Sequence, residues 1–196
     1  MLDEIEKLLL QHYPKNQGFF IFGSYVYGNA SPDSDVDVVV IEDSLSGQSK
    51  IHGKFDLQFV SKEEFKSQLK TCHIRALEGF FTEQKRLKFP ISKQDIDWDL
   101  LRSSISQKSS HSWVKAKKKL IDGEFYIGKK SLFHSLRIIL FGIQLAKDKA
   151  ITDFAQANEF YHPILSGPTD WEALLGDYKA QYNALHSEFK ALQPKK

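Results

Sequence analysis

The sequence predicts an α+β fold, with a small sheet-containing region to about residue 65 and a mostly helical remainder. Two observations indicate this order. Short runs rich in β-branched or aromatic residues, which are typical of buried strands, all lie in the first third of the 196-residue chain. Longer stretches in which apolar residues recur with a helical period occupy most of the chain after residue 98.

The first region is expected to alternate helices and strands. Leu2, Ile5 and Leu9 recur at helical spacing, and Ser24 to Gly28 is expected to open a short helix. Ser61 and Glu64 form a capping-box pattern that starts another helix. The expected elements are, in order, a helix over 2–11, strands over 18–22, 36–41 and 55–60, and a helix from 62 to about 73.

Strand signals fade after residue 75, and the stretch 75–89 is ambiguous between helix and strand. A polar junction at 109–112 gives the predicted domain boundary, with a catalytic domain over 1–108 and a helical domain over 109–196. Pro163, Gly167 and Pro168 predict a loop. The helices expected in this part are 99–110, 113–121, 129–147, 152–161 and 170–192.

Composition excludes several classes of protein. A single cysteine, Cys72, allows no disulfide framework and no multi-cysteine zinc site. The most apolar stretch, 131–146, is interrupted by polar residues and is shorter than the roughly 18–20 residues of a membrane span. The N-terminus is acidic where a signal peptide is basic. We therefore expect a cytoplasmic protein with no membrane partner.

Charge is distributed unevenly along the chain. Residues 1–64 hold 5 Lys/Arg and 11 Asp/Glu, a balance of −6, and the remaining residues hold 22 and 14, a balance of +8. The stretch 108–130 contains 7 lysines against Asp122 and Glu124. This asymmetry suits a protein that places metal ions beside a polyanion, and it also suits two solvated surfaces of opposite sign.

The stretch most informative about chemistry runs from Gly23 to Asp37 and has the pattern G-S-x3-G-x5-S-D-x-D between two predicted strands. Because strand side chains alternate, Asp35 and Asp37 point to one face, about 7 Å apart at the backbone. Two carboxylates so close repel each other unless a positive charge lies between them. An all-oxygen ligand set favours Mg²⁺ or Mn²⁺.

A third carboxylate, Asp56, lies on the next predicted strand, and if that strand lies beside the first one, Asp56 can bind a second ion. Two ions about 4 Å apart stabilise both the attacking and the leaving oxygen of a displacement at phosphorus. Gly23 lets the backbone approach a ligand closely, and Ser24 supplies a hydroxyl and an N–H for phosphate. Gly28 permits the turn that returns Ser34 and Asp35 to the same place.

These residues resemble the DNA polymerase β-type nucleotidyltransferases, especially their minimal stand-alone and antibiotic-modifying branch. The resemblance covers residues 18–61 and rests on Gly23, Ser24, Asp35, Asp37 and Asp56. It implies a small mixed-sheet catalytic core, two Mg²⁺ ions held by the three carboxylates, and a nucleoside triphosphate contacted by the Gly-Ser pair. It also implies that Asp56 helps to activate an acceptor hydroxyl, and that helical segments complete the nucleotide and acceptor sites.

The chain departs from the minimal members at Tyr27, where they often carry an arginine. Two alternatives to catalysis stay open at this stage. The first is an Asp-rich turn in which Asp33 and Asp35 cap the backbone. The second is a nucleotidyltransferase fold that has lost catalysis and acts as a binding module or antitoxin-like partner.

Basic residues in the second half supply further candidates. Lys130 and Arg137 are predicted to neutralise the triphosphate, with an internal ion pair as the alternative for Arg137. The lysines of 115–130 either contact RNA phosphates or form a solvated face. Three aromatic residues near the predicted site either stack a base or pack in a core, namely Tyr25, Tyr27 and Trp113.

The acceptor is expected to be an RNA 3′ end, such as that of a tRNA, because the second half is rich in lysine. A protein hydroxyl is a second option that suits the small size. A small molecule such as an aminoglycoside is a third, and its amino groups would be bound by acidic residues. The candidates for that role are Glu78, Asp95, Asp97 and Asp99.

Overall fold

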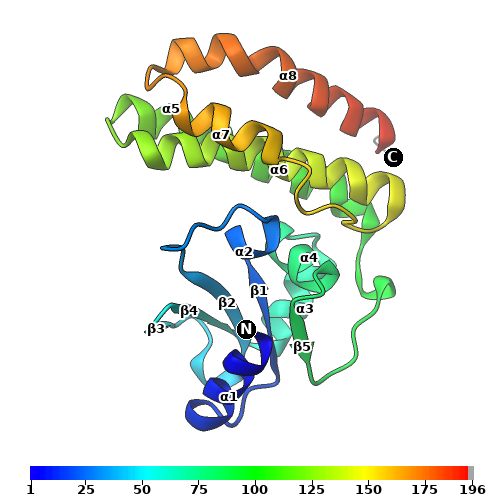
Figure 1. The fold of residues 1–196 in the computed structure, drawn as a ribbon. Coiled ribbons are helices and arrows are strands. Elements are labelled where there is room, and N and C mark those ends of the chain that lie inside the picture. Colours follow the sequence, from blue (N-terminus) through cyan, green and yellow to red (C-terminus); the bar gives the residue numbers. More distant parts are fainter. Residues whose placement is uncertain (194–196) are drawn as a thin grey trace. The chain divides into compact units, whose positions relative to one another are not determined.

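The computed structural model describes residues 1–193, which divide between Asp97 and Trp98 into two compact units (Figure 1). The first contains a five-stranded mixed sheet with helices, and the second is built from helices. This is the α+β class predicted from the sequence. The expected boundary at Ser109 falls inside a helix, because the Ser109 hydroxyl is buried and donates a hydrogen bond to the Ser135 carbonyl, 2.9 Å away.

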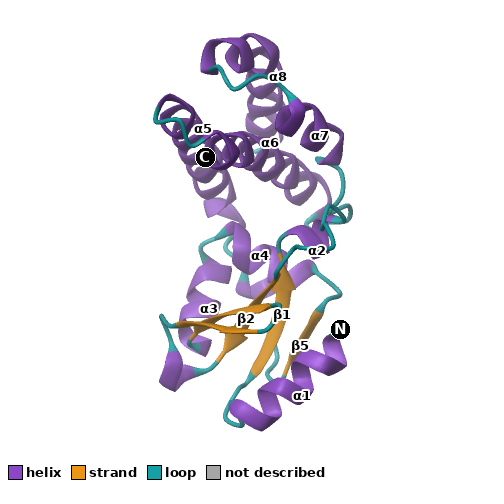
Figure 2. Cartoon of the chain, turned by 60° about the vertical axis from the view of Figure 1, so that its left-hand side comes forward, coloured by secondary structure: helices purple, strands orange, loops and turns teal. Residues whose placement is uncertain are grey.

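The sheet of the first unit, drawn in orange in Figure 2, has the strand order β3-β4-β2-β1-β5. β2 and β4 run parallel, and the other neighbours are antiparallel. The edge strand β5 lies in the stretch 75–89, whose sequence is ambiguous between helix and strand, and no strand was predicted at β3. The strands are β1 (Gly18–Phe22), β2 (Val36–Ile41), β3 (Ser49–His52), β4 (Phe55–Val60) and β5 (Lys85–Leu87).

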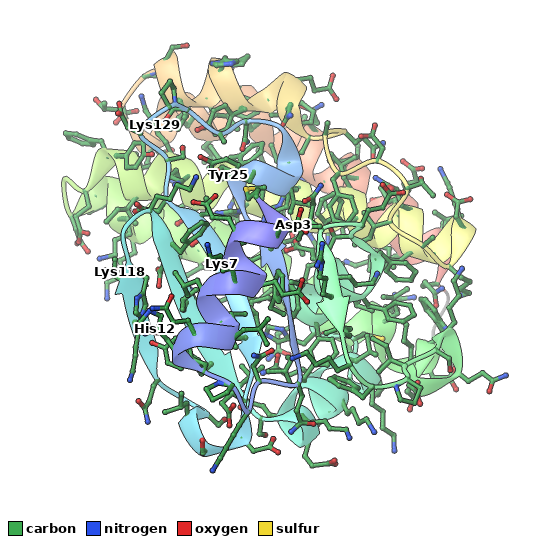
Figure 3. All side chains as sticks on the ribbon, turned by 60° about the horizontal axis from the view of Figure 1, so that its bottom comes forward. Asp3, Lys7, His12, Tyr25, Lys118 and Lys129 are labelled. Carbon is green, nitrogen blue, oxygen red and sulfur yellow. The ribbon has the colours of Figure 1, made fainter. Side chains whose placement is uncertain are left out.

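Helices cover both faces of this sheet. α1 (Leu2–His12) buries Ile5 and Leu9 against the inward residues of β1, β2 and β4, and its outer residues Asp3, Lys7 and His12 are exposed (Figure 3). The opposite face is covered by α3 (Lys62–Lys70) and α4 (Ile74–Phe81).

The sequence predicted one helix from 62 to about 73, and the structure ends it earlier. The backbone turns at Cys72, whose φ is 56°, so that α4 starts a second helix. A one-turn helix, α2 (Ser24–Tyr27), follows β1 as expected. Three 3-10 turns complete the irregular segments, at Asp43–Leu45, Lys93–Asp95 and Trp98–Leu100.

The second unit is organised around an antiparallel pair of long helices. Gly142 permits the close approach of these two helices, because a Cβ there would lie 2.6 Å from Ile105 Cγ2. Trp113, Phe133 and Trp171 belong to the core of this unit. Its helices are α5 (Leu101–Ile121), α6 (Phe125–Asp148), α7 (Asn158–Ser166) and α8 (Trp171–Leu192).

Two helix predictions in this unit were wrong. The two helices expected before residue 121 form one, because the serine-rich junction continues as helix and buries Ser109 against α6. The helix expected from Thr152 begins at Asn158, because the Gln144 side chain accepts the N–H groups of Thr152 and Asp153 and holds that segment as a loop.

α6 explains the apolar stretch of the second half. Nearly all of its residues from Gly128 to Leu145 are buried on every face. A helix surrounded by other helices is apolar all round for this reason. Among residues 1–193, no helix combines the length and apolar character that crossing a bilayer requires.

Candidate active site

The centre of the site is a pair of carboxylates on adjacent parallel strands. Asp37 is the second residue of β2 and Asp56 the second residue of β4, and the sheet register pairs them directly. Paired residues of neighbouring strands lie about 4.8 Å apart and point to the same face. Both side chains are half-buried. Asp56 therefore lies beside Asp37, on the face covered by α3 and α4.

Asp35 precedes β2 by one residue, lies on the same face as Asp37 by the strand period, and is exposed. Within residues 1–193, no group of three or more His, Cys, Asp or Glu side chains is arranged to hold a metal ion. Asp35 thus does not complete a three-carboxylate group with the other two. The donor chemistry of Asp37 and Asp56 still fits a hard divalent cation, which prefers carboxylate oxygens.

Gly23 lies directly against the Asp37 carboxylate. Its φ is 78°, a left-handed conformation that favours glycine. A Cβ at this position would lie 2.4 Å from Asp37 Oδ2, much closer than any van der Waals contact allows. The absence of a side chain is therefore what lets the bend between β1 and α2 approach the carboxylate. The approach of Gly23 to a bound ligand, which the sequence predicted, stays a prediction; the structure shows its approach to the Asp37 side chain.

The other motif residues shape the loop between α2 and β2. Ser24 is the first residue of α2 and half-buried, and Gly28 closes the helix with a φ of 75°. The Ser34 hydroxyl accepts a hydrogen bond from the Ser31 N–H at 2.9 Å, and the Tyr25 hydroxyl donates to the Ser34 carbonyl at 3.3 Å. The serines thus do the backbone capping. In the described chain, neither Asp33 nor Asp35 shows a capping hydrogen bond.

The aromatic candidates for base stacking have structural contacts. Tyr27 is buried, and its hydroxyl donates to Glu78 Oε2 at 2.7 Å. Tyr27 is the residue at which the chain departs from the arginine expected from the motif's resemblance. Trp113 packs against the rings of Trp171 and Tyr182 in the second unit. Packing within each unit is therefore the better account of Tyr27 and Trp113.

Two acids considered for an amine-bearing acceptor also have structural contacts. Glu78 is 3% exposed and accepts the Tyr27 bond. The Asp95 carboxylate accepts from the Ser92 N–H and closes a capping box at the start of a 3-10 turn. Each of these contacts gives its carboxylate a local role in the fold.

Arg75 and Gln58 belong to the carboxylate face, and the sequence did not single out Arg75. Gln58 lies two residues after Asp56 on β4, so the two side chains share a face. Arg75 Nη1 donates to Gln58 Oε1 at 2.7 Å, and its guanidinium carbon lies 5.9 Å from the centre of the Phe22 ring. Arg75 falls in the stretch whose secondary structure the sequence left ambiguous, so no periodicity placed it on this face.

The basic residues of α6 separate into two kinds. Lys129 is buried, and its ammonium donates to the carbonyls of Leu165 and Gly167, which ties α6 to the end of α7. Lys130 is half-buried, with its Nζ 5.2 Å from the centre of the Tyr126 ring. Arg137 is buried and lies over the rings of Phe133 and Phe141.

His134 lies in a region of positive potential in the second unit. Its pKa is lowered well below 6.5, first by burial and then by the charges of Arg137, Lys130, Lys115 and Lys108. The two last residues come from α5, so cations from both long helices converge here. The sequence predicted a phosphate-binding role for Lys130 and Arg137 and did not identify Lys108 as their neighbour. Helix pairing between α5 and α6 is needed to bring it there.

Comparison with known proteins agrees with this geometry. A family model described as a nucleotidyltransferase domain matches residues 2–109, more than half of the chain. The chain belongs to this family of nucleotidyltransferases, and a nucleoside triphosphate is the substrate that membership implies.

Among solved structures, the chain is similar to a nucleotidyltransferase-like protein from Exiguobacterium sibiricum 255-15. The two are 13% identical, the match covers 98% of this chain and 74% of that chain, and the TM-score is 0.36. A search of curated proteins found no match.

Proposed function

We propose that this nucleotidyltransferase moves a nucleoside monophosphate from a nucleoside triphosphate to the 3′ hydroxyl of an RNA, such as a tRNA, in a reaction that requires Mg²⁺ or Mn²⁺. The observation that carries the proposal is the register that pairs Asp37 with Asp56, with Gly23 against the Asp37 carboxylate. Two bound divalent ions would supply charge neutralisation at the phosphate undergoing transfer. We also propose that the enzyme works in the cytoplasm.

The first unit provides the groups that act at the reaction centre. Asp35, Asp37 and Asp56 would hold the metal ions, with Asp35 turning from its exposed position toward the other two. The oxygen of the acceptor hydroxyl would bond to the α-phosphorus, and Asp56 would take up the proton of that hydroxyl. The bond from the α-phosphorus to the bridging oxygen breaks, and pyrophosphate leaves. Gly23 and Ser24 would contact the triphosphate through backbone N–H groups and the Ser24 hydroxyl.

Gly28 and Ser34 complete the proposed nucleotide site by fixing the loop that carries Asp35. The helical unit, which begins at Trp98 and contains all of α5, would supply Lys130 and Arg137 for the triphosphate. Several cations, Lys130 and Arg137 among them, lie around His134 and repel one another. A bound triphosphate would lower this repulsion, which supports a role for these two residues in binding it. Phosphoryl transfer depends mainly on such positioning and charge neutralisation.

Exposed residues at one end of the α5–α6 pair support an RNA acceptor. Lys115, Lys117 and Lys118 are exposed, and none of them has an ion-pair partner among the described residues. Phe125 and Tyr126, at the start of α6, are 45% and 62% exposed. Proteins that bind single-stranded RNA combine lysines that neutralise phosphates with exposed aromatic rings that stack on bases.

The experiment is incubation of the protein with each α-labelled nucleoside triphosphate and Mg²⁺ in a total cell extract. The proposal predicts label in RNA, lost after ribonuclease treatment, and no label with the Asp37→Asn variant. RNA binding should weaken steeply with salt. Label found in protein or in small molecules, and not in RNA, would refute the RNA acceptor and leave the proposed nucleotidyl transfer intact. No transfer of any nucleotide, with no pyrophosphate released, would refute the enzymatic proposal.

A further inference from the structure

Arg75 projects from α4 onto the same face of the sheet as the two carboxylates. Phe22, Asp37 and Asp56 are in register across β1, β2 and β4, and the next row on that face contains Gln58. The Arg75 guanidinium contacts both rows, through the hydrogen bond to Gln58 and the ring of Phe22. Figures 1 and 2 both show α4 at the end of the sheet where α2 follows β1.

The guanidinium is fixed in place and still has hydrogen-bond donors to offer. Its bond to Gln58 uses Nη1, and the described chain gives Arg75 no other hydrogen bond and no carboxylate partner. Its other nitrogens are not among the buried polar atoms that lack partners, so they reach solvent. Arg86 in the same unit differs, because two carboxylates, Asp3 and Glu6, neutralise it.

The groups left available around Arg75 match a phosphate. The Gln58 carbonyl oxygen is occupied by Arg75, which leaves the amide N–H₂ of Gln58 and the free guanidinium N–H groups as donors. A planar guanidinium binds phosphate oxygens through paired hydrogen bonds. Because Gln58 and Phe22 already hold the side chain, little conformational freedom remains to be lost on binding.

We propose that Arg75 binds a phosphate group of the nucleotide at the edge of the carboxylate pair, with Gln58 as the residue that positions it. This inference rests on the proposed function, because it assigns a phosphate contact within the same site. It adds a residue outside the glycine–serine and aspartate motif. It also gives the second row of the sheet a role in substrate binding.

The test measures binding of ATP, AMP and pyrophosphate, each with Mg²⁺, by isothermal titration calorimetry without an acceptor. Arg75→Ala should weaken ATP binding roughly 10- to 100-fold, the usual effect of losing a charge-assisted hydrogen bond. Arg75→Lys keeps the positive charge and loses the paired N–H donors of the guanidinium, so it should bind ATP at least several-fold more weakly than the wild type. Gln58→Ala should weaken ATP binding less than Arg75→Ala does.

Arg102→Ala is the matched control, because Arg102 also donates only to neutral oxygens, the carbonyls of Lys190 and Gln193. It should bind ATP like the wild type. If Arg75→Ala binds AMP more weakly as well as ATP, Arg75 contacts the α-phosphate. If its binding of pyrophosphate is weakened and that of AMP is not, Arg75 contacts the phosphates that leave as pyrophosphate. Wild-type ATP affinity in Arg75→Ala, or in Arg75→Lys and Gln58→Ala if the first does not fold, would overturn the proposal. A missing transfer to RNA would leave these binding results valid.

Discussion

Replacing Gly23 with alanine tests whether the bend after β1 must touch the Asp37 carboxylate. The new Cβ would lie 2.4 Å from Asp37 Oδ2. Favourable contacts of carbon atoms lie at about 3.5–4.0 Å, so the carboxylate or the bend has to move by roughly 1 Å. Displacements of about 1 Å in a catalytic group cost on the order of 100-fold in rate. We therefore expect Gly23→Ala to reduce pyrophosphate release with total RNA as acceptor by about that factor.

Backbone strain contributes a second effect that a control can separate. The φ of Gly23 is 78°, and a residue with a Cβ in this region costs about 1–2 kcal/mol. Gly47 has a φ of 83° and no atom within 4 Å of a Cβ built there. Gly47→Ala should therefore lose about the same strain energy in urea unfolding and keep full activity. Equal stability loss and equal activity in the two variants would refute the close approach as a requirement of the site.

Three further predictions concern the second unit and the packing of the first. Lys129→Ala should lower the free energy of unfolding by about 1–3 kcal/mol, because two carbonyls lose their donor. Lys130→Ala should instead weaken ATP binding with little effect on unfolding. Urea titration and calorimetry on both variants check these two outcomes. The pKa of His186 is lowered to about 4, first by burial and then by Lys190 and Lys179. Between pH 6.5 and 4 the unfolded chain therefore binds a proton that the folded chain does not. The free energy of unfolding should fall by about 1–2 kcal/mol as the pH drops through that window. A His186→Gln variant with the same pH dependence as wild type would contradict this. Tyr27→Phe should lower the free energy of unfolding by about 1–3 kcal/mol through the loss of the buried bond to Glu78 and leave ATP affinity unchanged, and a large affinity loss would place Tyr27 in the site.

Local pattern was sufficient for the parts of the first unit that carry the motif. The β-branched and aromatic runs gave the three central strands, and the alternation of strand side chains placed Asp35 and Asp37 on one face. The pairing of Asp37 with Asp56 could be expected only through the family resemblance, because register between strands is a long-range property. The edge strand β3 was missed because three of its four residues are polar and its one apolar residue, Ile51, is exposed.

The residues that sequence reasoning missed depend on contacts between elements. Arg75 joins the carboxylate face only because the chain turns at Cys72 and starts α4 in a new direction. Lys129 and Lys130 are adjacent and identical in type, yet Lys129 is buried against carbonyls at the end of α7 and Lys130 is half-buried. Helical periodicity cannot separate them, because tertiary packing decides which side of α6 is covered.

The most direct test of the central claim is a titration of Mn²⁺ in the presence of ATP, followed by electron paramagnetic resonance. The account predicts that the wild type binds two Mn²⁺ ions and that Asp37→Asn and Asp56→Asn each lose at least one. Asp33→Asn, which changes an exposed carboxylate in the same loop, should bind like the wild type. Two tightly bound ions in the Asp56→Asn variant would contradict the claim that carboxylates from neighbouring strands share one metal centre.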